Sequence, residues 1–414
     1  MSRLDRVATV SARIGWKALT AAEYQVDGYA FLATPNIKNR NIDFTNVNYI
    51  SEFRYRESPE LQLTEGDVLL TKDGFTLGTV NIVRHVPRPA TVNGSIAVLR
   101  SFGIHSGFLH YVIASSITQE RIWAVKDGMD VLHLFQRDIK KLPVPLPPPE
   151  EQRRIANFLD SETARIDRLL SLQSRQLSLL SAHHRSRLSE TSDKLMRECG
   201  KIRLRHLLTR IEQGWSPQCE DRPAEGGDWG VIKAGCVNSG EFDTLQQKAL
   251  PQGIEPRLEY ALKPGDLLMS RASGSPELIG STGIVPDIQA NLLLCDKVYR
   301  LTVDQTRATT AFIAHMLRSH TVRERIRNGI SGADGMANNL PIPVVKDCVV
   351  PNAPFGKQGN IVTDLIRDRD ATARARSALE RSTSLIVERR QALITAAVTG
   401  QIDVSTASGR GIGE

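Results

Sequence analysis

Apolar residues recur at helical spacing in two long stretches of this 414-residue chain. The apolar positions of the first stretch include Ile155, Leu159, Ile166 and Leu180. No Pro or Gly interrupts it before Gly200, and Glu150 and Glu151 would lie in the first turn of a helix, where exposed amide groups favour negative charge. The pattern predicts one long helix over residues 150–198.

A second stretch with the same periodicity lies near the end of the chain, over residues 356–400. Its apolar positions include Leu365, Leu379, Ile386 and Leu393. A helix of about 45 residues is roughly 70 Å long, which is more than a compact domain needs. We therefore expect the two helices to pair with each other as an antiparallel coiled coil. In the alternative interpretation, each helix packs on its neighbouring domain as ordinary core.

The segments before the two helices have a different pattern. Short β-branched and aliphatic runs, such as Val68–Thr71 and Ile96–Leu99, alternate with Gly, Pro and Asn and indicate strands. Phe108 and Val112 fall at helical spacing and indicate a packed helix among these strands. The sequence predicts an α+β protein in which two mixed α/β domains, residues 1–149 and 199–355, are joined by the long helices. Residues 401–414 are expected to form a flexible tail.

The chain also contains an internal repeat. Gly66–Lys72 matches Gly265–Arg271 with a displacement of 199 residues. Gln152 and Leu159 match Gln358 and Leu365 with a displacement of 206 residues. A displacement that grows slightly and in one direction is expected from duplication followed by insertions in loops. The two halves should therefore share one fold.

Charge and composition add weaker constraints. The formal net charge is +7 and the isoelectric point is near 9.2, which favours an anionic partner such as nucleic acid. The five cysteines contain no Cys-x-x-Cys pair, which fits a reducing compartment. The chain begins without a secretory signal pattern, and no apolar run approaches the ~20 residues that a membrane span requires. We expect a cytoplasmic protein without a membrane partner.

Several catalytic motifs are missing. Gly74–Gly78 is followed by Thr79 and not by the Lys of a phosphate-binding loop, and no Gly-x-Gly-x-x-Gly opens a helix. His183 and His184 lie in a basic stretch that is more typical of a solvated helix face than of a metal site. We find no Ser, His and acid set. The sequence therefore favours a binding protein with no catalytic residues and no metal site.

Three segments resemble parts of the specificity subunits of type I restriction-modification enzymes. Pro145–Ala156, with the sequence PLPPPEEQRRIA, resembles the central junction of that family, and Arg390–Asp403 resembles its closing helix. Gly265–Ala272 is similar to a recurrent strand of its target-recognition domains. The junction before the second helix is a looser match, with Ala353 and Gly356 in place of Pro147 and Glu150.

The resemblance implies a subunit that reads an asymmetric, bipartite site in double-stranded DNA, one half-site per domain, with the helix pair setting the spacing. It also implies two methyltransferase subunits and restriction subunits as partners. These partners would bring S-adenosylmethionine, ATP and Mg, so that no cofactor is expected on this chain. Modification subunits would dock along the faces of the helices that carry basic residues. These residues are Arg165, Arg168, Arg374, Arg376 and Arg381. In the alternative interpretation, they form an ordinary solvated surface.

DNA contacts are expected from loops at the domain surface. The candidates are Lys38, Arg40, Lys72, Lys233, Arg271 and Ser273. Each could equally be an ordinary surface residue. Two other classes of function stay open at this point: a DNA-modifying or DNA-cleaving enzyme with a cryptic site, and a coiled-coil scaffold that does not bind DNA. The recognised bases and the spacer length do not follow from the sequence.

Overall fold

The computed structural model describes residues 1–13, 19–38, 40–128, 132–288, 290–330 and 338–404. The chain forms two compact units. The first contains residues 1–174 and 380–414, and the second contains residues 175–379. Each unit thus holds one mixed α/β domain together with part of both long helices. Most of the expected tail, residues 405–414, lies outside the described residues.

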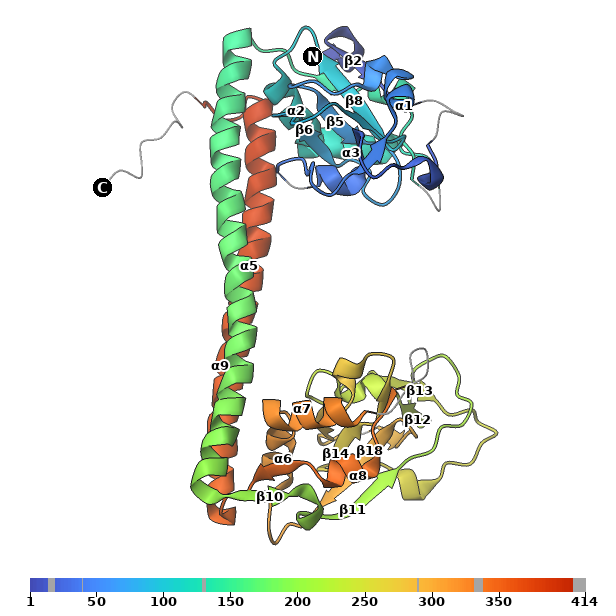
Figure 1. The fold of residues 1–414 in the computed structure, drawn as a ribbon, viewed down its shortest axis with the longest axis vertical. Helices are drawn as coiled ribbons and strands as arrows, with labels where there is room; N and C mark the ends of the chain where they lie inside the picture. Colours follow the sequence, from blue (N-terminus) through green and yellow to red (C-terminus); the bar gives the residue numbers. More distant parts are fainter. Residues whose placement is uncertain (14–18, 39, 129–131, 289, 331–337, 405–414) are drawn as a thin grey trace, which may run out of the picture. The chain divides into compact units, whose positions relative to one another are not determined.

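The domain of the first unit is built on two small sheets (Figure 1). A four-stranded antiparallel sheet has the order β2-β8-β5-β6, with β2 (Ala8–Ser11), β5 (Val68–Thr71), β6 (Val80–Ile82) and β8 (Ile96–Ser101). A three-stranded mixed sheet has the order β4-β3-β7, with β3 (Tyr29–Leu32), β4 (Asn48–Ile50) and β7 (Ala90–Val92). The terminal strands β1 (Ser2–Arg3) and β9 (Pro143–Val144) pair with each other. The α-helices of the described part of this domain are α1 (Glu52–Arg56), α2 (Ser106–Ala114), α3 (Ser116–Val125) and α4 (Gln136–Ile139).

The second unit repeats this topology. Its four-stranded sheet has the order β11-β18-β14-β16, with β11 (Leu208–Gln213), β14 (Leu267–Ser270), β16 (Thr282–Ile284) and β18 (Val298–Val303). Its three-stranded sheet has the order β13-β12-β17, with β12 (Trp229–Ile232), β13 (Gln247–Ala249) and β17 (Asn291–Leu293). The pairs β10 (Lys201–Arg203) with β20 (Val349–Pro351) and β15 (Ala272–Ser273) with β19 (Asn338–Asn339) complete the strands. The helices are α6 (Thr310–Met316), α7 (His320–Gly329) and α8 (Ile342–Lys346). The predicted duplication is therefore confirmed at the level of strand order.

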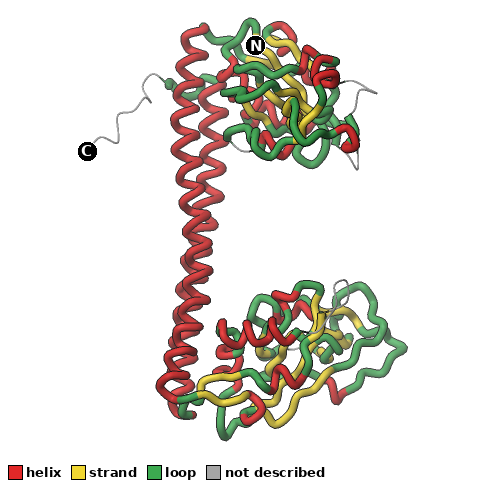
Figure 2. The backbone as a smooth tube through the Cα atoms, in the orientation of Figure 1, coloured by secondary structure: helices red, strands yellow, loops and turns green. Residues whose placement is uncertain are grey.

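The two long helices are α5 (Pro149–Cys199) and α9 (Phe355–Val398), and they lie side by side in both units (Figure 2). In the first unit, Gln173 Nε2 donates to Ser382 Oγ at 2.9 Å, and Asp167 lies 3.4 Å from Arg390. In the second unit, Arg376 Nη2 donates to Ser181 Oγ at 3.0 Å. The helices run antiparallel in each unit, as expected. The contacts in their middle parts include polar side chains and are not confined to an apolar seam.

The ends of the helices pack into the domain cores. In the first unit, Ile155 and Leu159 of α5 join Ile394 and Ala397 of α9 in the same apolar cluster as strands β5 and β8. In the second unit, the equivalent cluster contains Leu188 and Leu195 of α5 and Val362 and Leu365 of α9. The ends of the long helices therefore pack on the domains as ordinary core, as in the alternative interpretation. The middle parts of the two helices pair with each other.

The residues predicted to form the helix seam divide accordingly. Ile155, Leu159 and Leu365 are buried where a domain meets both helices. Ile166 is also buried, and Leu393 is half-buried against the first core. Leu180, Leu379 and Ile386 are half-buried. The five-segment division of the chain stays a prediction, because the compact units cut both helices in their middle.

A buried glutamine joins each domain to the start of its long helix. Gln152 Oε1 accepts from the His105 amide at 2.8 Å, and its Nε2 donates to Pro147 O at 2.8 Å. In the second unit, Gln358 Oε1 accepts from the Thr309 amide at 2.8 Å. A buried amide side chain that satisfies both its donor and its acceptor fixes the entry of the helix. This explains why Gln occupies the same place in both copies although the surrounding junction sequences differ.

The other long helix caps a helix of each domain. In the first unit, Thr395 Oγ1 of α9 accepts from the Ser116 amide at the start of α3, at 3.0 Å. In the second unit, Ser189 Oγ of α5 accepts from the His320 amide at the start of α7, at 3.0 Å. Each cap satisfies an amide that has no partner within its own helix. The roles of α5 and α9 are therefore exchanged between the two units.

We expect Leu159→Ala to lower the free energy of unfolding by about 3 kcal/mol, because the fully buried side chain sits where α5, α9 and the first domain meet. Leu385→Ala on the exposed face of α9 should change it by less than about 0.5 kcal/mol. Urea unfolding followed by circular dichroism measures both. Equal effects of the two substitutions would contradict the assignment of the junction.

Candidate nucleic-acid interface

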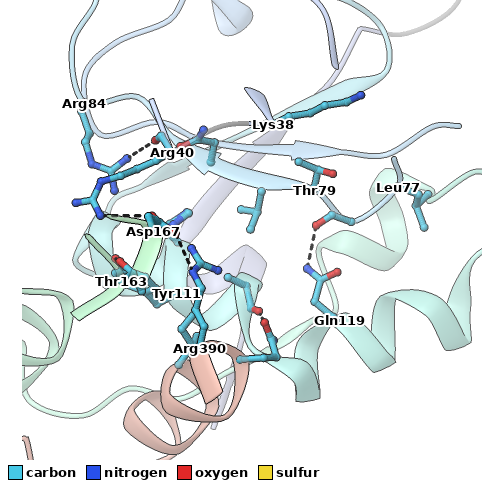
Figure 3. Close-up of a pocket in the computed structure, with 17 residues that line it drawn as sticks. Lys38, Arg40, Leu77, Thr79, Arg84, Tyr111, Gln119, Thr163, Asp167 and Arg390 are labelled. Atoms are coloured by element: carbon cyan, nitrogen blue, oxygen red, sulfur yellow. Dashed lines mark hydrogen bonds and ion pairs between the residues drawn. The ribbon is translucent and has the colours of Figure 1, made fainter. Parts of the chain in front are cut away.

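A cavity of about 380 Å³ lies in the first unit, where the domain meets both long helices (Figure 3). Four cationic side chains line it: Lys38, Arg40, Arg84 and Arg390. Lys38 and Arg40 follow the short 3₁₀ helix Thr34–Ile37, Arg84 follows β6, and Arg390 lies on α9. The fold thus collects positive charge from segments that are far apart in the sequence.

Two carboxylates of α5 organise three of these cations. Arg84 Nη2 lies 3.1 Å from Asp160 Oδ1, and its Nη1 donates to Arg40 O at 3.1 Å. Arg40 Nη1 lies 3.6 Å from Asp167 Oδ2, and Arg390 Nε lies 3.4 Å from Asp167 Oδ1. Lys38 is exposed, and the described part of the chain offers its ammonium group no carboxylate partner. Four cations therefore face two anions, and the cavity carries net positive charge.

Neutral groups form the wall of the cavity on α2. Tyr111 donates its hydroxyl to Asp160 Oδ1 at 2.8 Å and lies 3.1 Å from Thr163 Oγ1, and burial raises the pKa of this phenol. Burial also lowers the pKa of His110 to about 3, with a smaller contribution from the charge of Arg84. His110 is therefore neutral at neutral pH and adds no positive charge to the cavity.

The second unit has a cavity of about 720 Å³ at the equivalent junction. Its cationic lining residues are Arg185 on α5, Arg318 after α6, and Arg369 and Arg376 on α9. Arg369 lies 2.7 Å from Glu241 and 2.9 Å from Asp370. Again four arginine or lysine side chains face two carboxylates along the wall, although the residues that supply them differ from those of the first unit.

Arg318 is the most buried of these cations. Its Nη2 donates to Thr282 O at 3.1 Å and also to Gly240 O, and its Nε lies 3.3 Å from Thr282 Oγ1. Burial lowers the pKa of its guanidinium group to about 10, so it stays charged at neutral pH. Within the described residues no carboxylate lies at ion-pair distance from it. A buried cation whose partners are neutral favours an anion in the adjacent cavity.

A second basic cluster of this unit lies at the strand ends of its sheets. Lys233, Lys248 and Lys297 line a cavity of about 450 Å³, and Lys248 lies 2.8 Å from Asp221. Arg271 lies beside this cluster, because its amide donates to Lys297 O and its Nη1 donates to Asp296 O, both at 2.9 Å. The structure thus brings the predicted residues Lys233 and Arg271 into one region.

Lys72 and Ser273 are placed differently. Lys72 is largely buried, and its ammonium group lies 2.7 Å from Asp73, so a DNA contact would require this pair to open. Ser273 lies in β15 and its Oγ accepts from the Ser275 amide at 3.2 Å. Neither residue lines a junction cavity, whereas Lys38 and Arg40 do. The DNA contacts of all six candidates stay predictions.

Sequence reasoning missed Arg84, Arg390, Arg318 and Arg369. Arg84 follows β6, Arg318 follows α6, and the other two lie on α9, which was considered only as a docking surface. Their grouping depends on the packing of the long helices on the domains. Arg376 was identified as a helix-surface residue and lies at the second cavity. Arg165, by contrast, is occupied by a local ion pair with Glu162 at 2.9 Å.

Neither metal coordination nor a membrane span is evident in the described part of the chain. The described residues contain no cluster of three or more His, Cys, Asp or Glu side chains that could hold a metal ion. Burial raises the pKa of Cys295 to about 12 and that of Cys348 to about 11, so these thiols are protonated at neutral pH. None of the described helices combines the length and apolar character that crossing a bilayer requires. The expected cytoplasmic location stays a prediction.

Comparison with known proteins finds similar proteins of one type. Residues 2–174 match the family described as type I restriction modification DNA specificity domain. The chain as a whole is similar to specificity subunits of type I restriction enzymes. It is 23% identical over 368 residues to the EcoKI specificity subunit of Escherichia coli strain K12, covering 83% of this chain and 78% of that protein. It is 21% identical over 382 residues to the StySPI specificity subunit of Salmonella potsdam, covering 87% and 79% of the two chains.

Solved structures support the same fold. A chain from a study of complex assembly and conformational transition in the type I R-M system aligns with a TM-score of 0.71 at 16% identity, covering 97% of both chains. The HsdS subunit of Thermoanaerobacter tengcongensis aligns with a TM-score of 0.52 at 17% identity, covering 97% of this chain and 96% of that one. The fold class predicted from the sequence, with two mixed domains joined by long helices, is confirmed.

These similarities agree with the resemblance seen in the sequence, because the relatives are specificity subunits of type I restriction enzymes. The matched residues 2–174 comprise the described domain of the first unit and the first half of α5. The second unit repeats that arrangement in strand order.

The buried histidines should make the stability of the protein depend on pH. Burial lowers the pKa of His110 from 6.5 to about 3 and that of His315 from 6.5 to about 4. Below pH 6.5 the unfolded chain therefore binds more protons than the folded chain, and the free energy of unfolding falls as the pH falls. At pH 5 each histidine should contribute a loss on the order of 1–2 kcal/mol.

The double substitution His110→Gln and His315→Gln should flatten this dependence between pH 7 and pH 5. His85→Gln is the matched control, because His85 is exposed on the surface of the first domain. Urea unfolding at a series of pH values measures the slopes. Parallel curves for the native chain and the double variant would show that the buried histidines do not cause the loss.

Proposed function

We propose that this chain is the specificity subunit of a type I restriction-modification complex. It binds an asymmetric, bipartite sequence in double-stranded DNA, with one half-site for each mixed α/β domain. The observation that carries the proposal is the cation-lined cavity at the domain–helix junction of both units. DNA carries one negative charge per phosphate, and side chains of Arg and Lys that replace counterions supply much of the affinity of DNA-binding proteins. The positive formal charge of the chain is consistent with this partner.

Differences between the two junctions support an asymmetric target. The first cavity is lined by Lys38, Arg40 and Arg84 from the domain, whereas the second receives only Arg318 from its domain. The second unit also has the cluster of Lys233, Lys248 and Lys297 at a further cavity. Domains with one topology but different surface cations would hold DNA in similar ways and contact different base pairs.

The middle of the helix pair would hold the modification subunits. In the first unit, α5 exposes Leu169 and Leu172, and α9 exposes Leu385 and Val387, with 49–64% of each side chain accessible to solvent. Large apolar residues grouped on a solvent-exposed helix surface are typical of protein interfaces. We propose that two methyltransferase subunits dock along the helices and that restriction subunits join this complex. S-adenosylmethionine, ATP and Mg would then be bound by the partner subunits.

One experiment tests whether methylation of DNA is carried out by this chain or by its partner subunits. The purified subunit is incubated with DNA, S-adenosylmethionine, Mg and ATP, alone and with its methyltransferase subunits. We expect methylation only in the presence of the methyltransferase subunits. Modification or cleavage of DNA by the chain alone would overturn the proposal in favour of an enzyme with a cryptic site.

Exchange of one domain tests the assignment of half-sites. Residues 1–149 are replaced with the corresponding domain of another specificity subunit, and methylated positions are mapped by sequencing. We expect one half-site to change and the other to stay as it was. The reciprocal exchange of residues 199–355 is the control and should change the other half-site. Loss of both half-sites on either exchange would contradict independent reading.

Removal of a phosphate contact should act on all DNA sequences alike. Lys38→Ala in the complete complex should weaken binding to specific and nonspecific duplexes and reduce the slope of log K against log salt by about 1. Lys140→Ala is the matched control, because Lys140 is an exposed lysine of the same domain that does not line the cavity. Fluorescence anisotropy over a salt series measures both. An unchanged slope for Lys38→Ala would exclude this phosphate contact.

A further inference from the structure

The turn between β5 and β6 is tightly held. The Leu77 amide donates to Gly74 O at 3.1 Å, and the Gly78 amide donates to Thr71 O at 2.9 Å. The Gly74 amide is bonded to Leu132 O at 2.8 Å, which ties the turn to a neighbouring loop. Gly74 and Gly78 have φ angles of 83° and 88°, a conformation that favours glycine. The turn therefore has a defined shape before any partner binds.

This turn presents an aromatic ring to solvent. Phe75 is 93% exposed, whereas Leu77, two residues later, is 4% exposed and anchors the turn in the domain core. Phe75 thus contributes little to the folded state, because almost none of its apolar surface is buried. Single exposed apolar residues are common on proteins, so the exposure of Phe75 alone does not indicate a function. Its location in the fold has to be considered as well.

Phe75 lies in the turn that forms part of the wall of the first cavity. Leu77 to Thr79 of this turn line that cavity together with Lys38, Arg40 and Arg84. Earlier in the same turn, Asp73 is ion-paired with Lys72 at 2.7 Å and also contacts His133. The turn that carries the ring therefore has charged groups on both sides of it along the chain. An interface with an apolar protein surface would need further exposed apolar neighbours.

We propose that Phe75 contacts bases of the first DNA half-site, as an apolar wedge placed against a base step in a groove. This inference rests on the proposed function and names a residue that reads the DNA. Cations of the adjacent cavity hold the phosphates, and the rigid turn directs the ring toward the bases. Apolar side chains inserted at base steps are an established means of deforming and selecting DNA. A turn whose backbone is already fixed by hydrogen bonds loses little backbone entropy on contact.

The second unit has no aromatic residue at the equivalent turn. There, Ile279 is buried in the place of Leu77, and the Gly280 amide donates to Ser270 O at 2.7 Å. The turn contains the 3₁₀ helix Pro276–Leu278, and Glu277 lies 3.1 Å from Arg327. The wedge contact therefore belongs to the first half-site alone, which provides a physical basis for two unlike half-sites.

The test compares Phe75→Ala with the native subunit in the complex with its methyltransferase subunits. The probes are a labelled duplex that carries the methylated target and a second duplex in which only the first half-site is scrambled. We expect Phe75→Ala to weaken binding to the target about tenfold, as for one lost base contact, and to leave binding to the scrambled duplex and the salt slope unchanged. Phe75→Leu should recover part of the affinity.

Phe53→Ala is the matched control, since Phe53 on α1 is 73% exposed in the same domain. Equal melting temperatures of all variants establish that folding is intact, as the exposure of both rings predicts. If Phe75→Ala binds the target as the native complex does, or releases a protein subunit while DNA affinity is unchanged, the inference is wrong. If the native complex does not discriminate between the duplexes, the proposed function fails instead.

Discussion

Burial of the apolar ends of two long helices is the constraint on which both units of this protein depend. A helix of 51 residues cannot cover its own apolar side chains, and both domain cores include apolar residues from the two long helices. Each core is completed by segments of α5 and α9 together. In the first unit, the middle part of the pair makes polar contacts such as that of Gln173 with Ser382, and Leu169 and Leu385 stay exposed there.

The same junctions concentrate charge. Where a domain packs on two helices, side chains from three segments converge, and a few arginines are enough to make a cavity positive. The anchoring glutamines and the helix caps occupy equivalent positions in the two units, whereas the cations do not. Position 318 illustrates this: Arg318 fills the interior of the second junction, and the corresponding residue of the first unit is Ala114. Duplication has kept the framework and allowed the surface that faces a ligand to diverge.

Much of the framework could be predicted from the sequence, because it depends on local regularities. Apolar periodicity located α5 and α9 to within two residues, and the repeat of Gln152 at Gln358 predicted equivalent junctions. The candidate site depends on long-range packing and was predicted only in part. Lys38 and Arg40 were found as loop cations, but Arg390 joins them only through the packing of α9 on the first domain. The match of Lys72 to Arg271 gave no sign that Lys72 is buried against Asp73.

The contribution of α9 to the first core has a consequence for biosynthesis. Ile394 and Ala397 are translated more than two hundred residues after the strands they cover, and the cap of α3 by Thr395 is equally late. On the ribosome, the first domain must wait with an uncovered apolar surface until the end of the chain emerges. The second unit, whose residues 175–379 are contiguous, can close earlier. The first unit would thus be the last to complete its core, although its domain is the first to be synthesised.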